Sequence, residues 1–108
     1  MYQQETTNDD EMLTNTLTIL GLSKSEQDMY ALLMEIQSPQ PVFIIALEHE
    51  SSRQTTNSIL KRMTKKGIVI KSKHHGISCF HTNYKQLEKL IDSTISQLEN
   101  AKKILAPK

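Results

Sequence analysis

The segment Ser51–Gly67 carries the residue types best suited to bind a negatively charged partner. Its sequence, SSRQTTNSILKRMTKKG, contains five Lys or Arg residues and no Asp or Glu. Lys and Arg donate hydrogen bonds to phosphate oxygens, and Arg, Gln and Asn also donate to the edges of purine bases. The composition leaves two interpretations open, a cationic face that is merely solvated or a surface that lies against nucleic acid.

The spacing of the apolar residues in this segment predicts an amphipathic helix from Arg53 to Lys66. At about 100° per residue, the apolar side chains share one arc of about 100° and the polar side chains lie on the opposite face. The apolar stripe comprises Thr56, Ile59, Leu60 and Met63, and the polar face comprises Gln54, Asn57, Ser58, Lys61 and Lys65. This face lacks the Glu partners that form i, i+4 ion pairs on solvated helices, which favours docking in a DNA groove.

Residue types at both ends of the segment support these boundaries. Ser51 or Ser52 can cap the N-terminus, and Gly67 supplies the left-handed residue that closes the C-terminus. A short, very apolar helix, VFIIALEH, is predicted just before it, and only Glu50 and the two serines separate the pair. Two helices joined by so tight a turn form a helix-turn-helix candidate.

Two further helices are predicted ahead of this pair. EMLTNTLTIL has leucines at the spacing of one helical face, namely Leu13, Leu17 and Leu20. Gly21 ends that helix, and in SKSE the residues Ser23 and Glu26 form a capping box that starts a second helix running through Ile36. The prolines of SPQP then break the chain, because proline lacks a backbone donor and restricts the residue before it.

Beyond Gly67, two runs of β-forming residues predict a hairpin. The runs IVIKSK and ISCFHT flank HHG, where Gly76 permits the positive φ of a tight turn. Cationic or titratable side chains crowd its tip, namely Lys71, Lys73, His74 and His75. Such a hairpin can grip the DNA backbone as a wing in or over a minor groove. The order helix, helix, helix, hairpin predicts a winged helix-turn-helix fold, mainly α with a small β-hairpin (α+β).

The net charge of +1 conceals an uneven distribution along the chain. Residues 1–50 hold nine acids and the single cation Lys24, for a sum of −8, whereas residues 51–87 hold eight cations and no acid, for a sum of +8. Residues 88–108 add +1. Because attraction to phosphate is local, this asymmetry is typical of a protein that binds nucleic acid or an anionic surface.

The length of 108 residues fits one folded domain with a modest core. We expect a disordered acidic tail over residues 1–10, a winged helix-turn-helix DNA-binding domain over residues 11–83 and a C-terminal dimerisation helix over residues 84–108. No apolar run is long enough for a membrane span and none heads the chain as a signal peptide, so a cytoplasmic location is expected.

The C-terminal segment YKQLEKLIDSTISQLENAKKIL carries a heptad pattern. Apolar or small residues alternate steps of four and three, at Leu87, Ile91, Thr94, Leu98, Ala101 and Leu105. We expect this seam to form a homodimer, because an apolar stripe of this length is a liability on a monomer. The alternative is that the stripe folds back on its own domain. The first predicted helix is expected to pack against the same segment.

The segments LGLSKSEQDMYALLMEI and IALEHESSRQTTNSILKRMTKKGIVI together resemble the N-terminal DNA-binding domain of TrmB-type transcription regulators. The resemblance covers residues 20–105 and lies in the leucine-glycine-leucine lead, the capped helix with a central tyrosine and the lysine-glycine exit into the wing. It implies that the recognition-helix positions are Arg53, Gln54, Thr55, Asn57 and Lys61. It also implies that Lys71–His75 form the wing.

Two features depart from the family pattern. Glu50, Ser51 and Ser52 stand where the family usually has a glycine and often a proline, which bears on the geometry of the turn. Such regulators usually carry a C-terminal sugar-binding domain, which has no counterpart before Lys108, so the resemblance implies no effector pocket.

The remaining candidate chemistry is weak. A single cysteine, Cys79, excludes an internal disulfide and a multi-cysteine zinc site, and we expect it to be a small buried residue rather than a redox switch. His74 and His75, near the turn, need not reach the strand face that Cys79 shares with His81, so no metal site is predicted. The sequence has no Ser-His-Asp pattern, paired carboxylates at an apolar site or phosphate-binding glycine loop, so neither an enzyme nor a cofactor is expected.

Together these observations predict a sequence-specific transcription regulator that binds double-stranded DNA at an inverted-repeat operator as a homodimer. The residues expected to contact DNA are Ser52, Arg53, Gln54, Thr55, Asn57, Ser58, Lys61, Lys65, Lys71, Lys73, His74 and His75. The rival interpretation is a winged-helix protein-interaction module, whose cationic face meets an acidic protein or the chain's own acidic tail. Phosphate contacts would distinguish the two by a steep dependence of affinity on salt.

Overall fold

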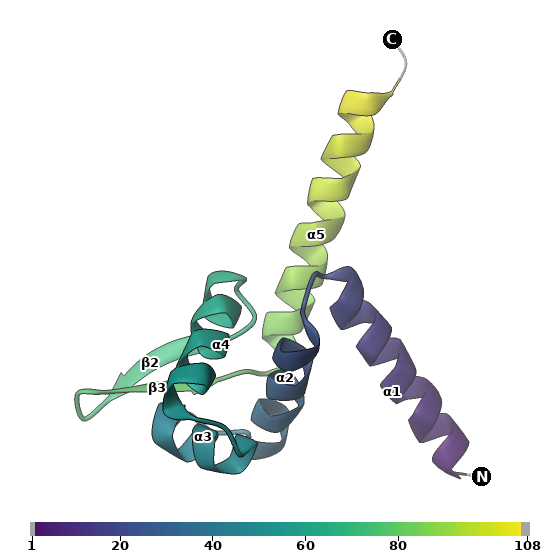
Figure 1. Cartoon of the computed structure of the whole chain (residues 1–108). Coiled ribbons are helices and arrows are strands. Elements are labelled where there is room, and N and C mark those ends of the chain that lie inside the picture. Colours follow the sequence, from purple (N-terminus) through teal and green to yellow (C-terminus); the bar gives the residue numbers. More distant parts are fainter. Residues whose placement is uncertain (1, 107–108) are drawn as a thin grey trace.

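A computed structural model describes residues 2–106, with side chains from Asp9 onward. Within these residues it contains five helices and one three-stranded antiparallel sheet (Figure 1). In chain order the elements are α1 (Tyr2–Ile19), α2 (Lys24–Ile36), β1 (Gln40–Pro41), α3 (Val42–His49), α4 (Arg53–Lys65), β2 (Ile70–His74), β3 (Ile77–His81) and α5 (Tyr84–Leu105). Three residues lie outside the described part of the chain. They are Met1, at the start of the predicted tail, and residues 107–108, at the end of the predicted C-terminal helix.

Helices α2, α3 and α4 pack around one hydrophobic core (Figure 1). Each of the three contributes fully buried side chains, namely Met29, Tyr30, Leu33, Ile45, Leu60 and Met63. Phe80 from the sheet and Leu87 from α5 complete the core. Full burial of such an apolar side chain contributes about 1.5–3 kcal/mol, so these contacts are the main source of stability. The order of elements predicted from the sequence is confirmed.

The predicted capping box starts α2. The backbone N–H of Glu26 donates to Ser23 Oγ at 3.3 Å, and the backbone N–H of Ser23 donates to Glu26 Oε1 at 2.7 Å. At the other end, Gln37 takes a left-handed conformation and donates its N–H to the carbonyl of Leu33 at 3.0 Å. Local hydrogen bonds therefore fix both ends of α2.

The turn between α3 and α4 is closed by a left-handed residue that is not glycine. Glu50 has a φ of 54°, and its N–H donates to carbonyl oxygens in the last turn of α3. Ser51 Oγ lies 2.7 Å from Thr56 Oγ1 and 3.0 Å from His49 Nδ1. These polar contacts hold a backbone conformation that glycine would adopt without strain. The missing glycine therefore does not prevent the helix-turn-helix geometry.

The wing contains one strand more than the sequence predicted. Strand β3 pairs with β2 and also with β1, so the order in the sheet is β1-β3-β2. Pro41 of β1 lies opposite Cys79, and its missing N–H is tolerated because β1 is an edge strand. In the hairpin turn both His75 (φ 54°) and Gly76 (φ 81°) are left-handed, which is the pattern of a type I′ turn.

Helix α1 corrects the expectation of a disordered tail over residues 1–10. The helix runs from Tyr2 to Ile19, so the described part of that predicted tail is helical. Its C-terminal end is anchored by Leu17, which is only 3% exposed. Once such an end is fixed, each further residue adds a backbone hydrogen bond, so a helix can extend through residues that have no apolar face.

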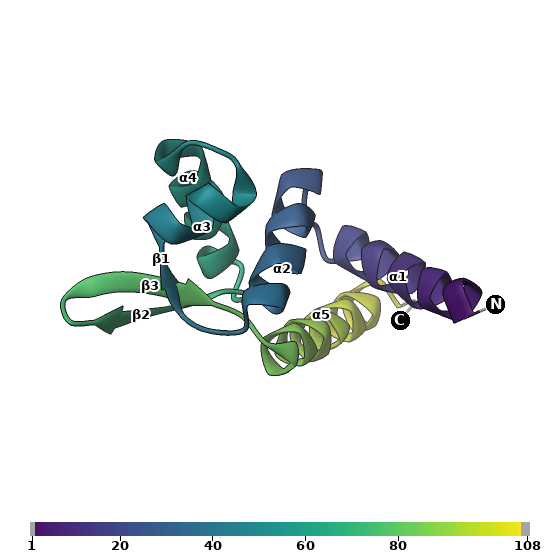
Figure 2. The same cartoon turned by 90° about the horizontal axis from the view of Figure 1, so that it is seen from below.

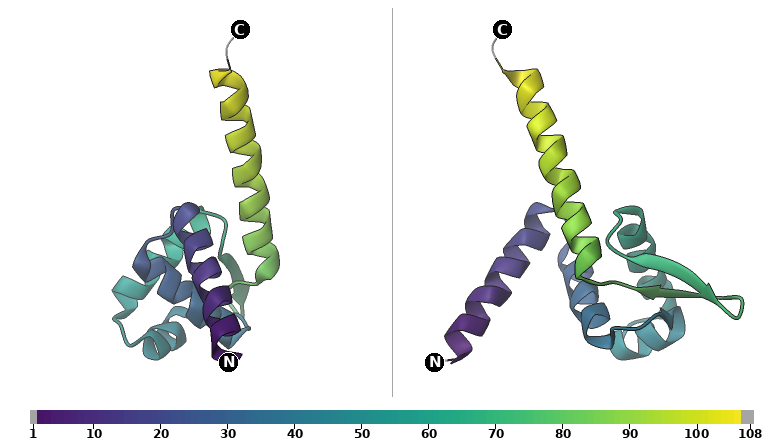
Figure 3. Two further views of the ribbon diagram at one scale, coloured as in Figure 1. Left: turned by 90° about the vertical axis from the view of Figure 1, so that its right-hand side faces the viewer. Right: turned by 180° about the vertical axis from the view of Figure 1, so that it is seen from behind.

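Helices α1 and α5 extend from this body as two arms (Figures 1 and 3). Leu17 and Leu20, at the end of α1, pack in the core that also holds Leu87, and the rest of α1 points away from α5 (Figure 3). The expected packing of the first helix on the C-terminal helix is therefore limited to this junction. The radius of gyration of 16.2 Å exceeds the value of about 13 Å for a compact domain of this length.

The apolar seam of α5 is divided between two environments. Leu87 is buried in the core, and Leu90 and Ile91 pack against it. Farther along the helix, Leu98 is 62% exposed and Leu105 is 81% exposed. The first part of the seam therefore folds back on its own domain, and only the distal part is free to meet a partner.

Replacing Glu50 with glycine is expected to stabilise the fold. The substitution removes left-handed strain of about 1–2 kcal/mol and adds about 0.5–1 kcal/mol of backbone entropy to the unfolded chain. The free energy of unfolding, measured with urea, should therefore rise by about 0.5–1 kcal/mol. Gly67→Ala, at a φ of 85°, should lower it instead. A Glu50→Gly protein no more stable than wild type would show that strain at Glu50 does not limit stability.

Candidate nucleic-acid interface

Helix α4 has one buried face and one exposed polar face, as the sequence predicted. The apolar stripe of Thr56, Ile59, Leu60 and Met63 is at most 3% exposed. On the opposite face Asn57 is half-buried, and Gln54, Ser58, Lys61 and Lys65 are exposed. Arg53 and Thr55, in the first turn of the helix, are exposed as well. No Asp or Glu occurs between residues 51 and 87, so this face carries only positive charge.

Ser52 fixes the start of α4. Its Oγ accepts the backbone N–H of Thr55 at 3.0 Å, and its hydroxyl donates to Thr55 Oγ1, also at 3.0 Å. The first bond satisfies one of the unpaired backbone donors at the helix N-terminus. Both hydrogen bonds of the Ser52 hydroxyl, which was predicted to contact DNA, are therefore used in the cap. The Thr55 hydroxyl accepts one of them and can still donate a hydrogen bond to another group.

Strands β2 and β3 carry the wing away from the helical body, on the side opposite α1 (Figures 1 and 2). Lys71 and Lys73 alternate along β2 with half-buried Ser72, and both lysines are exposed. His74 and His75 are exposed at the tip, where His74 Nε2 lies 3.1 Å from Ser72 Oγ. The structure therefore brings the four predicted wing residues together on one projecting hairpin.

Arg53 rests on an aromatic ring that sequence reasoning did not connect with it. Its guanidinium carbon lies 5.4 Å from the ring centre of Phe43, on α3. A shallow hollow beside this contact is lined by Phe43, Ala46, Leu47, Ser51 and Arg53. Phe43 is 42% exposed and Leu47 is 72% exposed. Phe43 and Leu47 are four residues apart, so the sequence alone could have placed both on one face of the helix.

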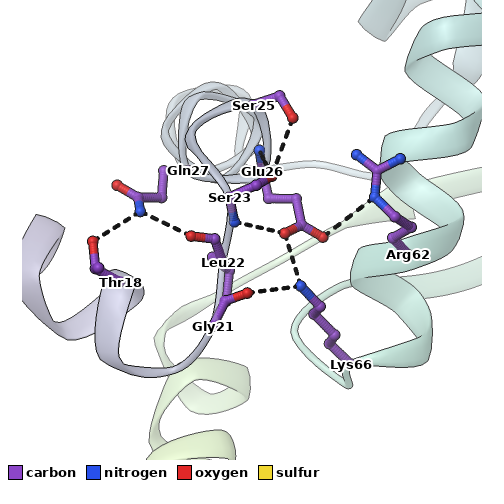
Figure 4. Close-up of polar contacts among 9 residues, drawn as sticks. All are labelled: Thr18, Gly21, Leu22, Ser23, Ser25, Glu26, Gln27, Arg62 and Lys66. Carbon is purple, nitrogen blue, oxygen red and sulfur yellow. Dashed lines mark hydrogen bonds and ion pairs between the residues drawn. The ribbon is translucent and has the colours of Figure 1, made fainter.

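Two cations at the end of the segment turn their charged groups toward α2 (Figure 4). Lys66 Nζ donates to Glu26 Oε1 at 2.8 Å and to the carbonyl of Gly21 at 2.9 Å. Arg62 Nε lies 3.6 Å from Glu26 Oε2. Of the five cations in residues 51–67, the three that have no such ion pair are Arg53, Lys61 and Lys65.

Glu26 is the buried partner of these cations, with only 1% of its surface exposed. Burial raises the pKa of its carboxyl group, but hydrogen bonds from Lys66 and Ser23 lower it by more, so the pKa lies below its ordinary value of 4.5. The group is therefore ionised at neutral pH. The sequence indicated its capping role, but not this second role, because Lys66 is 40 residues away along the chain.

The cysteine and histidines of the hairpin do not converge. Cys79 is 5% exposed, which confirms the prediction of a small buried residue, and His81 is half-buried. Among the residues that the structure describes, no three His, Cys, Asp or Glu side chains are placed to hold a metal ion together. Within residues 2–106, no helix has the length and apolar character to cross a membrane.

Comparison with sequences finds one relative of limited overlap. No family model matches the chain. Over 96 residues it is 29% identical to Aorsin from Aspergillus oryzae, a match that covers 77% of this chain and 15% of that protein. Since the chain spans so small a part of this relative, the match assigns no activity to it.

Solved structures with the same architecture include transcription regulators. A MarR family protein from Bacillus stearothermophilus is 16% identical, with a TM-score of 0.53 over 97% of this chain and 76% of that one. The homodimeric winged helix-turn-helix DNA-binding domain of a possible ArsR-family regulator from Mycobacterium bovis is 14% identical, with a TM-score of 0.54 over 92% and 94%. FabT from Streptococcus pneumoniae, solved in complex with DNA, is 14% identical, with a TM-score of 0.53 over 97% and 82%.

These likenesses define the class of fold. At such low identities they show that the chain has the winged helix-turn-helix fold, which confirms the fold predicted from the sequence. The same fold serves DNA-binding transcription regulators of the MarR and ArsR types. The closer resemblance to TrmB-type regulators stays a prediction.

Replacing Phe43 is expected to release Arg53 without unfolding the domain. The ring current of Phe43 should shift the Arg53 Hδ resonances upfield in wild type, and Phe43→Leu should abolish the shift. Because an exposed cation–π contact contributes about 0.5–1 kcal/mol, the free energy of unfolding should fall only slightly. Leu47→Ala, which truncates the neighbouring exposed side chain, should leave the Arg53 resonances unchanged. Identical Arg53 resonances in wild type and Phe43→Leu would disprove the contact.

Proposed function

We propose that this protein is a sequence-specific DNA-binding transcription regulator. The observation that carries the proposal is the exposed face of α4, which presents polar and cationic side chains without a single acid and lies on a rigid, capped helix. The wing adds the exposed cations Lys71 and Lys73. The fold shared with FabT, which was solved in complex with DNA, supports the same conclusion.

In this proposal α4 enters the major groove with its N-terminal turn toward the bases. The groove is about 12 Å wide and admits a helix, and the 13 residues of α4 span about 20 Å. Arg53, Gln54 and Asn57 then reach base edges, while Lys65 and Lys73 neutralise phosphates. Contact with Phe43 restricts the Arg53 side chain before binding, so less conformational entropy is lost when the guanidinium meets a base.

The proposed regulator is a homodimer joined through the distal half of α5. Leu98 and Leu105 are largely exposed there, and Ile95, which the heptad pattern did not include, is 49% exposed. Since Leu87 belongs to the core of its own domain, the proposed interface is shorter than the predicted seam. The homodimeric state of the domain from Mycobacterium bovis supports a dimer, and a two-fold dimer matches an inverted-repeat operator.

The position of α1 bears on the rival interpretation. Helix α1 lies on the far side of α2 from α4 and the wing (Figures 1 and 2), so exposed Asp9, Asp10 and Glu11 do not cover the cationic face of their own chain. A separate acidic protein would be the remaining kind of partner for a protein-interaction module. Salt distinguishes it, because each neutralised phosphate contributes about −0.9 to the slope of log affinity against log salt.

Substitutions at the two ends of α4 are expected to differ in effect. Arg53→Ala or Asn57→Ala should relax sequence preference, at a cost of about 1–3 kcal/mol for a lost bidentate base contact. Lys65→Ala and Lys73→Ala should instead weaken binding to all DNA alike and reduce the salt slope by about one unit each. Selection of bound fragments from random DNA, followed by competition titrations, measures both effects.

The matched control is Lys89→Ala, which removes an exposed cation from α5 and should change neither motif nor slope. If Asn57→Ala selects the wild-type motif with undiminished preference, α4 does not read bases as proposed. If the wild-type protein selects no motif and shows a shallow salt slope, the protein-interaction module becomes the better interpretation.

Leu98→Glu is expected to give a folded monomer with weaker operator binding. In a symmetric pair it sets two carboxylates against each other in an apolar contact, which should cost several kcal/mol of association. The core near Leu87 is untouched, so circular dichroism should stay unchanged. Light scattering measures the mass, and titration on the selected operator measures the loss of affinity from separating two linked half-site contacts.

Asn100→Glu is the matched control, because it adds the same charge to an exposed α5 position away from the seam. It should remain dimeric. A folded Leu98→Glu protein that also stays dimeric with full affinity would move the interface elsewhere, and the candidate is then Met12 and Leu13 of α1, which are 68% and 37% exposed.

A further inference from the structure

One buried carboxylate, that of Glu26, joins three parts of the fold (Figure 4). Its Oε1 accepts the backbone N–H of Ser23 at 2.7 Å, where α2 begins, and Lys66 Nζ at 2.8 Å, just beyond α4. The same ammonium donates to the carbonyl of Gly21 at 2.9 Å, in the connection between α1 and α2. These contacts tie the C-terminal end of α4 to that connection.

The second oxygen of this carboxylate depends on α4 as well. Glu26 Oε2 is buried and has no hydrogen-bond partner among the described residues, and Arg62 Nε lies 3.6 Å away. A buried ionised carboxylate is costly unless cations lie close to it. The electrostatics of Glu26 therefore favour the orientation of α4 that brings Arg62 and Lys66 toward α2.

The network also reaches the end of α1. Gln27 Nε2 donates to Thr18 Oγ1 in α1 and to the carbonyl of Leu22, each at 3.0 Å (Figure 4). Gln27, the residue after Glu26, thus helps to hold the connection between α1 and α2 in place. The orientation of α4 is consequently fixed relative to α1 as well as α2.

We propose that Glu26 is a positioning residue for DNA recognition, which fixes the angle of α4 and holds Arg62 and Lys66 away from the phosphate backbone. The inference rests on the proposed function. Because α4 is about 20 Å long, a tilt of about 10° at its C-terminal end would move its N-terminal turn by about 3.5 Å, which is more than the length of a hydrogen bond. Base contacts by Arg53 and Asn57 therefore depend on a contact at the opposite end of the helix.

Two adjacent lysines make this proposal testable, because it gives them different tasks. Lys65 is exposed and has no ion pair within the described structure, so it is free to meet a phosphate. Lys66 is engaged with Glu26 and Gly21. Removal of the first should reduce the number of phosphates contacted, and removal of the second should disturb base readout.

The experiment compares Lys66→Met and Glu26→Gln with Lys65→Met and with Asp28→Asn in the full chain. Asp28 is the matched control, since it is a carboxylate on the same helix whose ion pair with Lys24, at 2.9 Å, is exposed. Two quantities are measured for each folded variant. The first is the ratio of affinities for the selected operator and for an operator with one substituted base pair, and the second is the salt slope.

In specific complexes one substituted base pair changes affinity by about 5- to 150-fold. Lys66→Met and Glu26→Gln should each reduce this affinity ratio by at least about threefold. The salt slope of Lys66→Met should equal that of wild type, and Lys66→Arg, which keeps the cation, should restore the ratio. The slope of Glu26→Gln should be at least as steep as that of wild type, because this substitution frees Arg62 and Lys66 to meet phosphates. Lys65→Met should keep the ratio and lower the slope by about one unit. Asp28→Asn should change neither quantity. A merely destabilised protein would lose active concentration, but the ratio would stay the same.

Two results would overturn the proposal. If the salt slope of Lys66→Met falls as much as that of Lys65→Met, Lys66 contacts a phosphate. Variants Lys66→Met and Glu26→Gln that retain the wild-type ratio would show that α4 is positioned without this carboxylate. If Lys66→Met does not fold, Glu26→Gln supplies the same test with little change in size. If the wild-type protein selects no DNA motif, the proposed function is wrong, and the positioning role that rests on it is wrong as well.

A measurement without DNA tests the carboxylate itself. Lys66 and Arg62 are the charged groups that face Glu26, and its folded-state pKa lies below 4.5. Ionised Glu26 therefore stabilises the fold above that pH, and its contribution is lost as the pH falls through the lower folded-state pKa. The Tm of wild type should exceed that of Glu26→Gln by the largest amount at neutral pH, and this difference should shrink below about pH 4. A difference independent of pH would contradict the ionised contact.

Discussion

Burial of one face of α4 is the constraint on which the rest of this structure depends. A helix of 13 residues is marginal in water by itself, so the stripe from Thr56 to Met63 must pack on α2 and α3 for α4 to persist. The helical period then decides which side chains face outward. The same burial that stabilises the domain therefore creates its rigid cationic surface.

Charge alone overstates the size of that surface. Residues 51–67 carry five cations, yet Arg62 and Lys66 are paired with the buried carboxylate of Glu26. An acid from the negatively charged half of the sequence thus acts inside the positively charged half of the fold. Glu26 divides the cations into those that hold α4 in place and those free to meet an external anion.

The two arms, α1 and α5, differ from the body of the domain in how much of their surface is buried. The first turns of α5 belong to the core, but its distal half and most of α1 extend beyond it (Figure 3). An elongated shape of this kind buries less surface per residue than a compact domain, so apolar side chains such as Leu98 stay exposed in the single chain. In the proposed dimer, the partner's α5 would cover them and would hold two α4 helices at a fixed separation.

Local patterns in the sequence determined what depends on near neighbours, namely the capping box of α2, the apolar stripe of α4, the hairpin and the order of elements. They predicted the second half of α1 but missed its first half, because helix extension from an anchored end leaves no apolar period in residues 2–10. Only the tertiary structure decided which parts meet at long range. Pro41 joins the sheet opposite Cys79, Phe43 supports Arg53, and Glu26 receives Lys66 from 40 residues away. The spacing of residues along a helix or strand carries no record of such contacts, because they depend on how whole elements pack.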